Sequence, residues 1–457
     1  MTAHRALHFR GARLIDPRTQ RDETGELLVV DDRIQSIAFG GRVDAPKHAE
    51  VIDCSGAILC PGLIDPHVHL REPGGEAKET ILTGTQSAAA GGFTTVCCMP
   101  NTNPCLDTAM AVRFVEGRAA EAANSRVFVV GAATVGRKGE QLAPMASMSH
   151  AGAVAFSDDG DGIASAGMMR RVLEVCKTLD RAFMQHCQDP TLSEGGLVNE
   201  GPVATRLGLP PWPRDAEEVM LERDLRLNAR IDARYHAQHL SSGGSARILR
   251  EARARVGCDR AHRISGEASP HHLLMTCDAC EGYNTGAKMN PPLRTKWDIS
   301  ELKLAIADGS IDVLATDHAP HTAAEKARDF ASAPFGIIGL ECALALYAKA
   351  LVHDGVIEWP RLIELLTLQP AKLCGLDRKV EGIGTLTVGG VADLTLIDPE
   401  HNWTIRVDAF RSKSRNCPFD GMTVRGKAIM TIRAGEVLFT DDCVATHLSA
   451  SQATSAR

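Results

Sequence analysis

Apolar and polar positions alternate with a period of two along residues 1–58. The segments LHFRGARLID, GELLVVDDRIQSIA and EVIDCSGAIL show this pattern, with turn-forming residues between them. Successive side chains of a strand point to opposite faces, so the pattern predicts short, half-buried β-strands. The same alternation of apolar and polar residues returns in GTLTVGGVADLTLIDPEHNWTI and GMTVRGKAIMTIRAGEVLF. We therefore expect a small β-sandwich domain built from residues 1–60 and 380–443, followed by a disordered Ala-, Ser- and Thr-rich tail at 444–457.

The middle of the chain, residues 61–379, has a different pattern. Short apolar segments alternate with stretches of helical periodicity such as SAGMMRRVLEVCKTL and SSGGSARILREARARV. The predicted strands are AILCPGLIDPHVH, FTTVCCMPN, RVFVVGAAT, AVAFSDD, AFMQHC, RYHAQHL, RISGEASPHHL and IDVLATDHAPH. This alternation is typical of parallel strands connected by helices, and its length fits a barrel of ~250 residues with insertions. The predicted fold is α/β: a TIM-type (β/α)8 barrel with the small β domain attached.

Composition is that of a globular protein and disfavours several partners. The chain has 457 residues, of which 44% are hydrophobic and 23% charged, enough to bury a large core. Its net charge of −7 argues against nucleic acid and anionic membranes as partners. No apolar run approaches the roughly 18 residues of a membrane span. The first residues lack the apolar core of a signal peptide, so we expect a cytoplasmic protein.

The cysteines do not indicate a disulfide framework. There are fourteen, scattered singly and often inside apolar runs, where cysteine behaves as a small buried hydrophobe. Cys277 and Cys280 form one C-x-x-C, but a structural zinc site needs four ligands and no second pair stands at a suitable spacing. Chance or surface placement is the favoured interpretation of that pair.

Most predicted barrel strands end in a residue that binds metals or protons. These residues are His67, His69, Asp159, His186, His239 and Asp317. The carboxyl ends of all strands in a parallel barrel open on one face, so these residues would converge there. His67 and His69 stand two apart in a strand and would both face the barrel mouth. Imidazoles with carboxylates suit zinc or a similar divalent ion. Because six ligands exceed what one tetrahedral zinc requires, we expect two metals that share a bridging carboxylate.

Each of these residues also has a simpler interpretation when taken alone. A histidine at a strand end can serve as a hydrogen-bonded packing residue, and Asp317 could form only a helix cap or an Asx turn. Asp161, in the run DDGDG, competes with Asp159 as the ligand. The joint placement of all six residues at predicted strand ends favours the metal site.

Longer motifs carry a resemblance to a known family. PGLIDPHVHLREPGGEAKET followed by AGGFTTVCCMPNTNP resembles the signature of class I dihydroorotases in the amidohydrolase superfamily. AFSDDG, QHC, SPHHLL, KMNPPLR, LATDHAPH and APFGIIGLE follow in the same order, so the resemblance covers nearly the whole chain. It implies reversible hydrolysis of L-dihydroorotate to N-carbamoyl-L-aspartate in pyrimidine (UMP) biosynthesis, with two Zn²⁺ per subunit. It also implies a homodimer and a possible complex with aspartate transcarbamoylase.

The resemblance implies a role for each matching residue. His67 and His69 match the first pair of metal ligands, Asp159 the bridging carboxylate, and His186 and His239 the ligands of the second metal. Asp317 matches a ligand that also acts as the catalytic acid and base. The residues that match substrate contacts are His69, Arg71, Asn101, Asn290, His321, Phe335 and Gly336. A guanidinium can hold the substrate carboxylate with two hydrogen bonds, which suits Arg71, although a salt bridge at the barrel rim is the alternative.

Two other functions stay open at this level. An allantoinase or hydantoinase would share the H-x-H barrel but typically lacks an arginine after the second histidine, so HLREPG favours dihydroorotate. A catalytically silent homologue that scaffolds aspartate transcarbamoylase would have lost metal ligands, and every ligand is present here. Residues 190–235, which include LGLPPWPRDAEE, align only loosely with the family, and their contacts stay unassigned.

Overall fold

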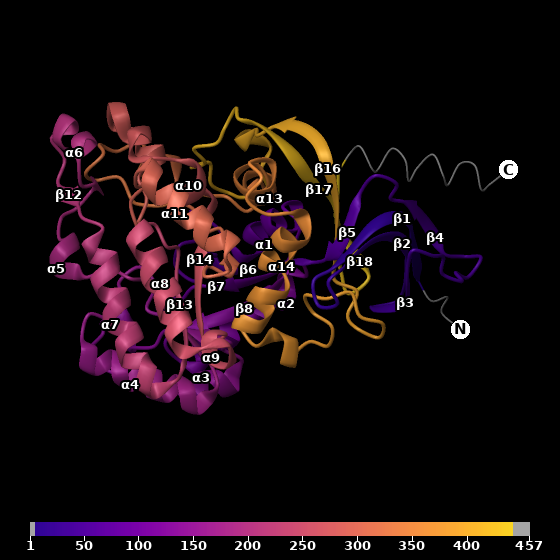
Figure 1. Ribbon diagram of the computed structural model, residues 1–457, viewed down its shortest axis with the longest axis horizontal. Coiled ribbons are helices and arrows are strands. Elements are labelled where there is room, and N and C mark those ends of the chain that lie inside the picture. Colours follow the sequence, from indigo (N-terminus) through magenta and orange to yellow (C-terminus); the bar gives the residue numbers. More distant parts are fainter. Residues whose placement is uncertain (1–4, 442–457) are drawn as a thin grey trace.

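The computed structural model describes residues 5–441 and has two parts, a helix-covered barrel and a β-sheet domain beside it (Figure 1). The first and last strands of the chain, drawn in indigo and yellow, lie together in the sheet domain. The predicted tail at 444–457 lies outside the described residues. Within residues 5–441, no helix has both the length and the apolar character needed to cross a membrane.

Eight parallel strands form the barrel and follow one another in chain order. They are β6 (Leu63–Val68), β7 (Phe93–Cys98), β8 (Arg126–Gly131), β9 (Ala155–Phe156), β10 (Ala182–Gln185), β13 (Arg234–Ala237), β14 (Ile264–Ala268) and β15 (Val313–Leu314). An isolated bridge between Val68 and His318 joins the end of β6 to the segment after β15, so the barrel is nearly closed. Each predicted strand segment contains one of these strands, and the predicted barrel is confirmed.

Helices between the strands cover the outside of the barrel. The longer ones are α1 (Ile81–Ala90), α2 (Ala109–Ala122), α3 (Met145–Ala151), α4 (Ala166–Leu179), α7 (Asp215–Ile231), α8 (Gly243–Val256), α11 (Lys296–Ala307) and α14 (Trp359–Leu366). In α4, Met169, Val172 and Cys176 are buried, because residues three and four apart share one helix face. Shorter elements are α5 (Pro190–Ser193), α6 (Pro202–Leu207), α9 (Cys258–Ala261), α10 (Pro270–Leu274), α12 (Ala323–Lys326), α13 (Ala343–Tyr347), α15 (Leu368–Leu373), β11 (Val198–Asn199) and β12 (Pro211–Trp212).

The sheet domain is assembled from both ends of the chain, as predicted. Its strands are β1 (Ala6–Asp16), β2 (Arg21–Val30), β3 (Arg33–Phe39), β4 (Glu50–Asp53), β5 (Ile58–Pro61), β16 (Leu394–Thr404), β17 (Thr423–Arg433) and β18 (Glu436–Thr440). They form one hydrogen-bonded sheet in the order β18-β17-β16-β5-β1-β2-β3, with β4 also paired to β1. β1 changes partner at a register shift near Gly11, from β4 to β5, and strands on both sides of this shift share one apolar core.

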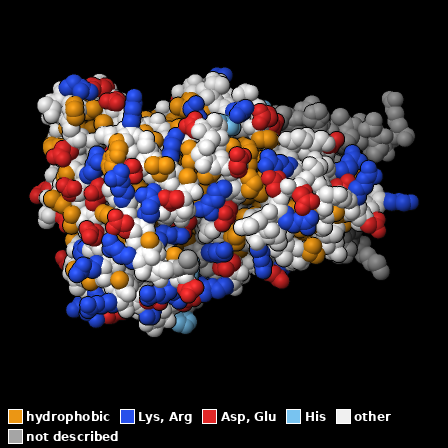
Figure 2. Space-filling view, in the orientation of Figure 1, with side chains coloured by type: hydrophobic (Ala, Val, Ile, Leu, Met, Phe, Trp, Pro, Cys, Tyr) orange, Lys and Arg blue, Asp and Glu red, His pale blue; other side chains and the backbone are white. Residues whose placement is uncertain are grey.

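The chain passes from the sheet domain to the barrel at Gly62. β5 ends at Pro61 and β6 begins at Leu63, so the single predicted segment AILCPGLIDPHVH contains two strands that belong to different sheets. A Cβ atom at Gly62 would lie 2.2 Å from Oγ1 of Thr94, so the crossing leaves no room for a side chain. On the face shown in Figure 2, cationic and anionic side chains are interspersed over both domains.

Candidate metal centre and active site

The six predicted ligands lie at or just beyond the carboxyl ends of barrel strands. His67 lies in β6 and His69 just after it, and His186 directly follows β10. Asp159, His239 and Asp317 follow β9, β13 and β15 within three residues. All six side chains are buried, none in a residue more than 8% exposed. The sequence prediction that these residues converge at one mouth of the barrel is therefore met by the structure.

The carboxylate of Asp159 lies among the four histidines. Its Oδ1 is 3.4 Å from Nε2 of His67, 3.5 Å from Nδ1 of His186 and 3.5 Å from Nε2 of His239. Its Oδ2 is 3.6 Å from Nε2 of His69. One carboxylate thus faces both pairs of imidazoles, which is the arrangement required of a bridging ligand.

Asp317 completes the cluster on the side of the first histidine pair. Its Oδ1 lies 3.0 Å from Nε2 of His69 and 3.6 Å from Nε2 of His67. Burial alone would raise the pKa of Asp317, but the imidazoles that face its carboxylate, first His69 and then His67 and His239, lower that pKa below its usual range. Asp317 and His239 both have left-handed backbone angles, with φ of 50° and 30°, a strained geometry that is common at functional sites.

Hydrogen bonds orient three of the imidazoles. Nδ1 of His67 donates to Oε1 of Glu267 at 2.6 Å, and Nδ1 of His69 faces Oδ1 of Asn101 at 2.8 Å. Nε2 of His186 faces Oε1 of Gln188 at 2.7 Å. Because a carboxylate or amide oxygen can only accept, each ring carries its hydrogen on that side. The other nitrogen then presents a lone pair to the cluster, which is the usual outer-shell arrangement of metal-binding histidines.

These donors fit divalent metal ions. Nε2 of His67 is buried and has no hydrogen-bond partner among residues 5–441, so its lone pair is available to a metal ion. Two groups of three residues could each hold a metal ion, because the ligand atoms within each group lie within 4.8 Å of one another. One group is His67, Asp159 and His239, and the other is His67, His69 and Asp317. Nitrogen and carboxylate oxygen donors around a buried point are typical of zinc and similar cations.

The three acidic residues of the DDGDG run have different positions. Asp158 accepts hydrogen bonds from the backbone N–H groups of Ala133, at 2.9 Å, and Thr134, at 3.0 Å, so it orders the neighbouring loop. Asp161 is exposed and pairs with Arg137 at 2.9 Å. Only Asp159 faces the histidines. The structure therefore favours Asp159 over Asp161 as the metal ligand, because of side-chain positions that the sequence of the run does not reveal.

Arg71 and His321 lie side by side at the mouth. Nε of Arg71 donates to the carbonyl of Pro320 at 3.2 Å, and its Nη2 lies 3.5 Å from Nε2 of His321. Burial, and then the charge of Arg71, lower the pKa of His321 to about 3. The neutral ring donates from Nε2 to the carbonyl of Phe335 at 2.7 Å, so its buried Nδ1 is an acceptor, and no residue in the described part of the chain donates a hydrogen bond to it.

The predicted asparagines are joined to the ligand cluster. Asn101 contacts His69 and also donates to Oδ2 of Asp159 at 3.4 Å. Asn290 donates to Oε1 of Gln188 at 3.0 Å, while its own Oδ1 is buried and accepts no hydrogen bond from any described residue. Gly336 has φ of 116°, and a Cβ there would lie 2.8 Å from Cβ of Ala319, so this position requires glycine.

Several residues around the site were missed from the sequence. Glu267 binds His67 and also accepts from Nε2 of His236 at 3.0 Å. An acidic residue inside the apolar strand RISGEASPHHL was a signal that could have revealed it. Trp212, in the unassigned segment 190–235, packs edge-on against Phe335 with ring centroids 5.8 Å apart. The C-x-x-C pair of Cys277 and Cys280 is buried rather than at the surface, and neither belongs to a candidate metal group among residues 5–441.

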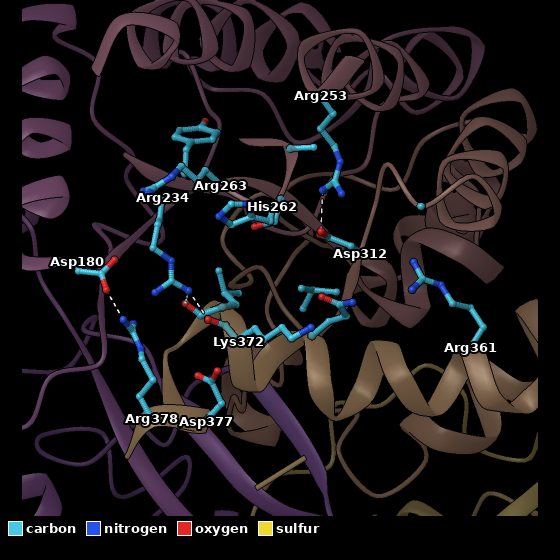
Figure 3. A pocket seen from close by; sticks show the side chains of 17 residues that line it. Asp180, Arg234, Arg253, His262, Arg263, Asp312, Arg361, Lys372, Asp377 and Arg378 are labelled. Atoms are coloured by element: carbon cyan, nitrogen blue, oxygen red, sulfur yellow. Dashed lines mark hydrogen bonds and ion pairs between the residues drawn. The ribbon is translucent and has the colours of Figure 1, made fainter. Parts of the chain in front are cut away.

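A cavity of about 690 Å³ lies at the opposite, amino-terminal end of the barrel strands (Figure 3). Residues at or next to the starts of β13, β14 and β15 line it, including Arg234 and Val313. Two of its arginines are already engaged, since Arg253 pairs with Asp312 at 2.6 Å and Arg234 donates to the carbonyl of Leu373 at 2.9 Å. None of the predicted ligands lines this cavity. We interpret it as part of the barrel floor, whose contacts support stability.

Comparison with known proteins agrees with the geometry. A family model described as Dihydro-orotase-like matches residues 56–245. Dihydroorotases of Pelotomaculum thermopropionicum and Geotalea daltonii are 44% and 45% identical over 95% of this chain and over 99% and 100% of their own lengths. Among solved structures, an L-hydantoinase (dihydropyrimidinase) of Arthrobacter aurescens shares the fold, with a TM-score of 0.83 and 24% identity over 95% of this chain and 96% of its own. Barrel, ligand cluster and near-full-length identity lead to one conclusion: the chain belongs to the dihydroorotase family of the amidohydrolase superfamily.

Proposed function

We propose that this chain catalyses the reversible hydrolysis of L-dihydroorotate to N-carbamoyl-L-aspartate in pyrimidine biosynthesis. The observation that carries the proposal is the buried cluster of four histidines and two aspartates, with Arg71 beside it at the same mouth. The relatives named dihydroorotase, at 43–45% identity over 94–95% of the chain, support the same substrate.

We propose that the cluster holds two Zn²⁺ ions per subunit. His67 and His69 would hold one and His186 and His239 the other, with Asp159 shared and Asp317 beside the first pair. When bound, such cations lower the pKa of water toward ~7 and polarise a substrate carbonyl. The protein supplies the ligands and, through Glu267 and Gln188, orients them.

Asp317 is proposed as the acid and base. Its carboxylate is ionised at neutral pH, so it has a free oxygen lone pair that can accept the proton of the attacking water. The same carboxyl group can then return that proton to the departing ring nitrogen. Its position at the end of the last barrel strand, beside His69, places it at the inner wall of the mouth.

The remaining predicted residues fit the polar groups of the substrate. Arg71 presents a guanidinium that can pair with the substrate carboxylate. Oδ1 of Asn290 and Nδ1 of His321 are buried acceptors that have no hydrogen-bond partner within residues 5–441, which suits the ring N–H groups of dihydroorotate. Asn101, joined to His69 and Asp159, would supply its amide at the inner edge of the same space. Phe335 and Gly336 would provide the backbone on the His321 side.

The rival substrates are cyclic amides without a carboxylate. Solved hydantoinases share the fold at 21–25% identity, which is much lower than the identity to dihydroorotases. Arg71 is the residue that separates the two readings, because a hydantoin or allantoin ring offers no carboxylate for it to hold.

One experiment tests the proposal. The purified chain is analysed for bound metal and assayed with dihydroorotate, allantoin and hydantoin under the same conditions. We expect turnover of dihydroorotate, with Arg71→Met raising its KM by ~10-fold or more because the paired charge is lost. Arg170→Met, which removes an exposed arginine on α4, is the matched control. Preferred turnover of hydantoin or allantoin, or an unchanged KM in Arg71→Met, would contradict the substrate assignment.

The oligomeric state of the protein, its cellular location and the limits of its two domains are also proposals. We propose a cytoplasmic homodimer, able to associate with aspartate transcarbamoylase, in which residues 61–379 form the catalytic barrel and residues 1–60 and 380–443 the β domain. Light scattering of the purified chain, alone and mixed with that enzyme, measures both assembly states.

A further inference from the structure

Two buried lysines outside the ligand cluster contact a single segment of the active-site wall. Lys288 is 1% exposed and Lys326 is 9% exposed. Among residues 5–441, neither ammonium group has a carboxylate within ion-pair distance. A buried ammonium is costly unless its hydrogens are satisfied, so the groups that do satisfy them indicate what each lysine is for.

Both lysines bind the backbone of residues 330–336. Nζ of Lys288 donates to the carbonyls of Phe330 at 2.6 Å, Ala331 at 2.9 Å and Ala333 at 2.6 Å, which uses all three of its hydrogens. Nζ of Lys326 donates to the carbonyls of Pro334 at 3.0 Å and Gly336 at 3.1 Å. Five of the seven carbonyls in this segment therefore accept hydrogen bonds from lysine.

This segment is neither helix nor strand, so its carbonyls have no regular backbone partners. The remaining contacts connect it to the proposed substrate site. The carbonyl of Phe335 holds His321, and the ammonium of Lys288 lies 4.4 Å from the centre of the Phe335 ring. The N–H of Gly336 donates to the carbonyl of Lys288 at 2.9 Å.

Lys288 also stands two residues before Asn290, in the KMNPPLR motif. Its side chain and its carbonyl thus join the segment that carries Asn290 to the segment that carries Phe335 and Gly336. These are two separate parts of the proposed substrate wall, and a loop fixed in advance loses less entropy when a ligand binds.

We propose that Lys288 and Lys326 are positioning residues for substrate binding, acting through the backbone of residues 330–336. They touch neither the metal cluster nor the reacting atoms, so their effect is on the fit of the substrate and not on proton transfer. The inference rests on the proposed function for its substrate, whereas the anchoring of the segment can be measured without any substrate.

The test uses Lys288→Met and Lys326→Met, with Lys349→Met as the control because Lys349 is an exposed lysine outside this segment. We expect KM for dihydroorotate to rise about tenfold or more in both variants, with kcat within roughly threefold of the parent and metal content unchanged. Hydrogen exchange of the peptide spanning 326–336 should become faster in these variants and stay unchanged in Lys349→Met.

The proposal is overturned if both the KM for dihydroorotate and the hydrogen exchange of the segment are unchanged in the variants. It is also overturned if exchange becomes faster throughout the barrel and metal is lost, because that result indicates general destabilisation. If Lys288→Met does not fold, the result for Lys326→Met decides the proposal. We expect that variant to fold, because the carbonyl of Gly336 keeps a hydrogen bond from Asn416 at 3.1 Å when Lys326 is replaced. A parent protein that is inactive on dihydroorotate would refute the proposed function alone, since the exchange measurement would still report on the anchoring.

Discussion

The carboxylate of Glu267 lies 2.6 Å from Nδ1 of His67 and so determines which nitrogen of that ring faces the cluster of predicted ligands. The two residues are 200 positions apart in the chain. Glu267 also accepts the backbone N–H of His239 at 3.1 Å. One buried acid thereby positions ligands from two strands, and both proposed metals depend on it.

Replacing Glu267 tests this relationship. We expect Glu267→Gln to weaken metal binding by ~10- to 100-fold, because the amide no longer polarises His67 as a carboxylate does. Competition with a chelator measures the affinity directly. Glu174→Gln, which changes an exposed glutamate on α4, is the control and should bind metal normally. Equal affinity in both variants would mean that Glu267 serves only packing.

The neighbouring acids Asp159 and Asp161 give a matched pair. Asp159→Asn should lose bound metal and activity together, because its carboxylate is the one that faces four histidines. Asp161→Asn should keep both, since that side chain is exposed and forms a surface ion pair with Arg137. Metal analysis and turnover of the two proteins provide the comparison. The reverse result would reassign the bridging ligand.

The proposed acid and base is Asp317. Asp317→Asn should keep most of its metal, because five other ligands remain, while kcat falls by ~10²- to 10⁴-fold through loss of proton transfer. Metal content and kcat measured on the same preparation separate the two effects. Near-normal kcat in a metal-loaded variant would remove Asp317 from the mechanism.

Glu341 should make stability depend on pH. It accepts the N–H groups of Arg411 at 2.9 Å and Ser412 at 3.0 Å, yet burial outweighs these bonds and raises its pKa from 4.5 to about 7. Between these two values the folded state binds more protons than the unfolded state, so the contribution of Glu341 to stability is present below pH 4.5 and is lost as pH rises to about 7. Glu341→Gln removes this titration.

The measurement is the Tm of both proteins from pH 4.5 to 7.5. We expect the Tm of Glu341→Gln to gain on that of the parent chain as pH rises through this range, because only the parent pays to ionise a buried carboxyl group. Glu436→Gln is the control, as it changes an exposed glutamate in β18. Parallel curves for parent and Glu341→Gln would show that Glu341 ionises normally.

Periodicity and residue type along the chain were enough to predict the barrel, the two-ended β domain and the six residues at strand ends. Those features are local: an apolar run flanked by turns predicts a strand, and a histidine or aspartate at its end is visible without any partner. The same local pattern predicted β5 and β6 as a single strand, because Gly62 does not interrupt the run of hydrophobic residues. The reason that this position has no room for a side chain is its contact with Thr94 in β7, which the local pattern does not show.

Only the tertiary structure decided which acid of DDGDG faces the histidines, which nitrogen of each imidazole is free, and what holds the wall around His321. Glu267, Lys288 and Asn416 act on residues that are remote in the chain, through hydrogen bonds whose distance and direction no linear pattern encodes. A sequence determines where such groups stand along their strands and loops. Which of them meet depends on how the barrel closes, because a hydrogen bond requires two groups within about 3 Å in the right orientation.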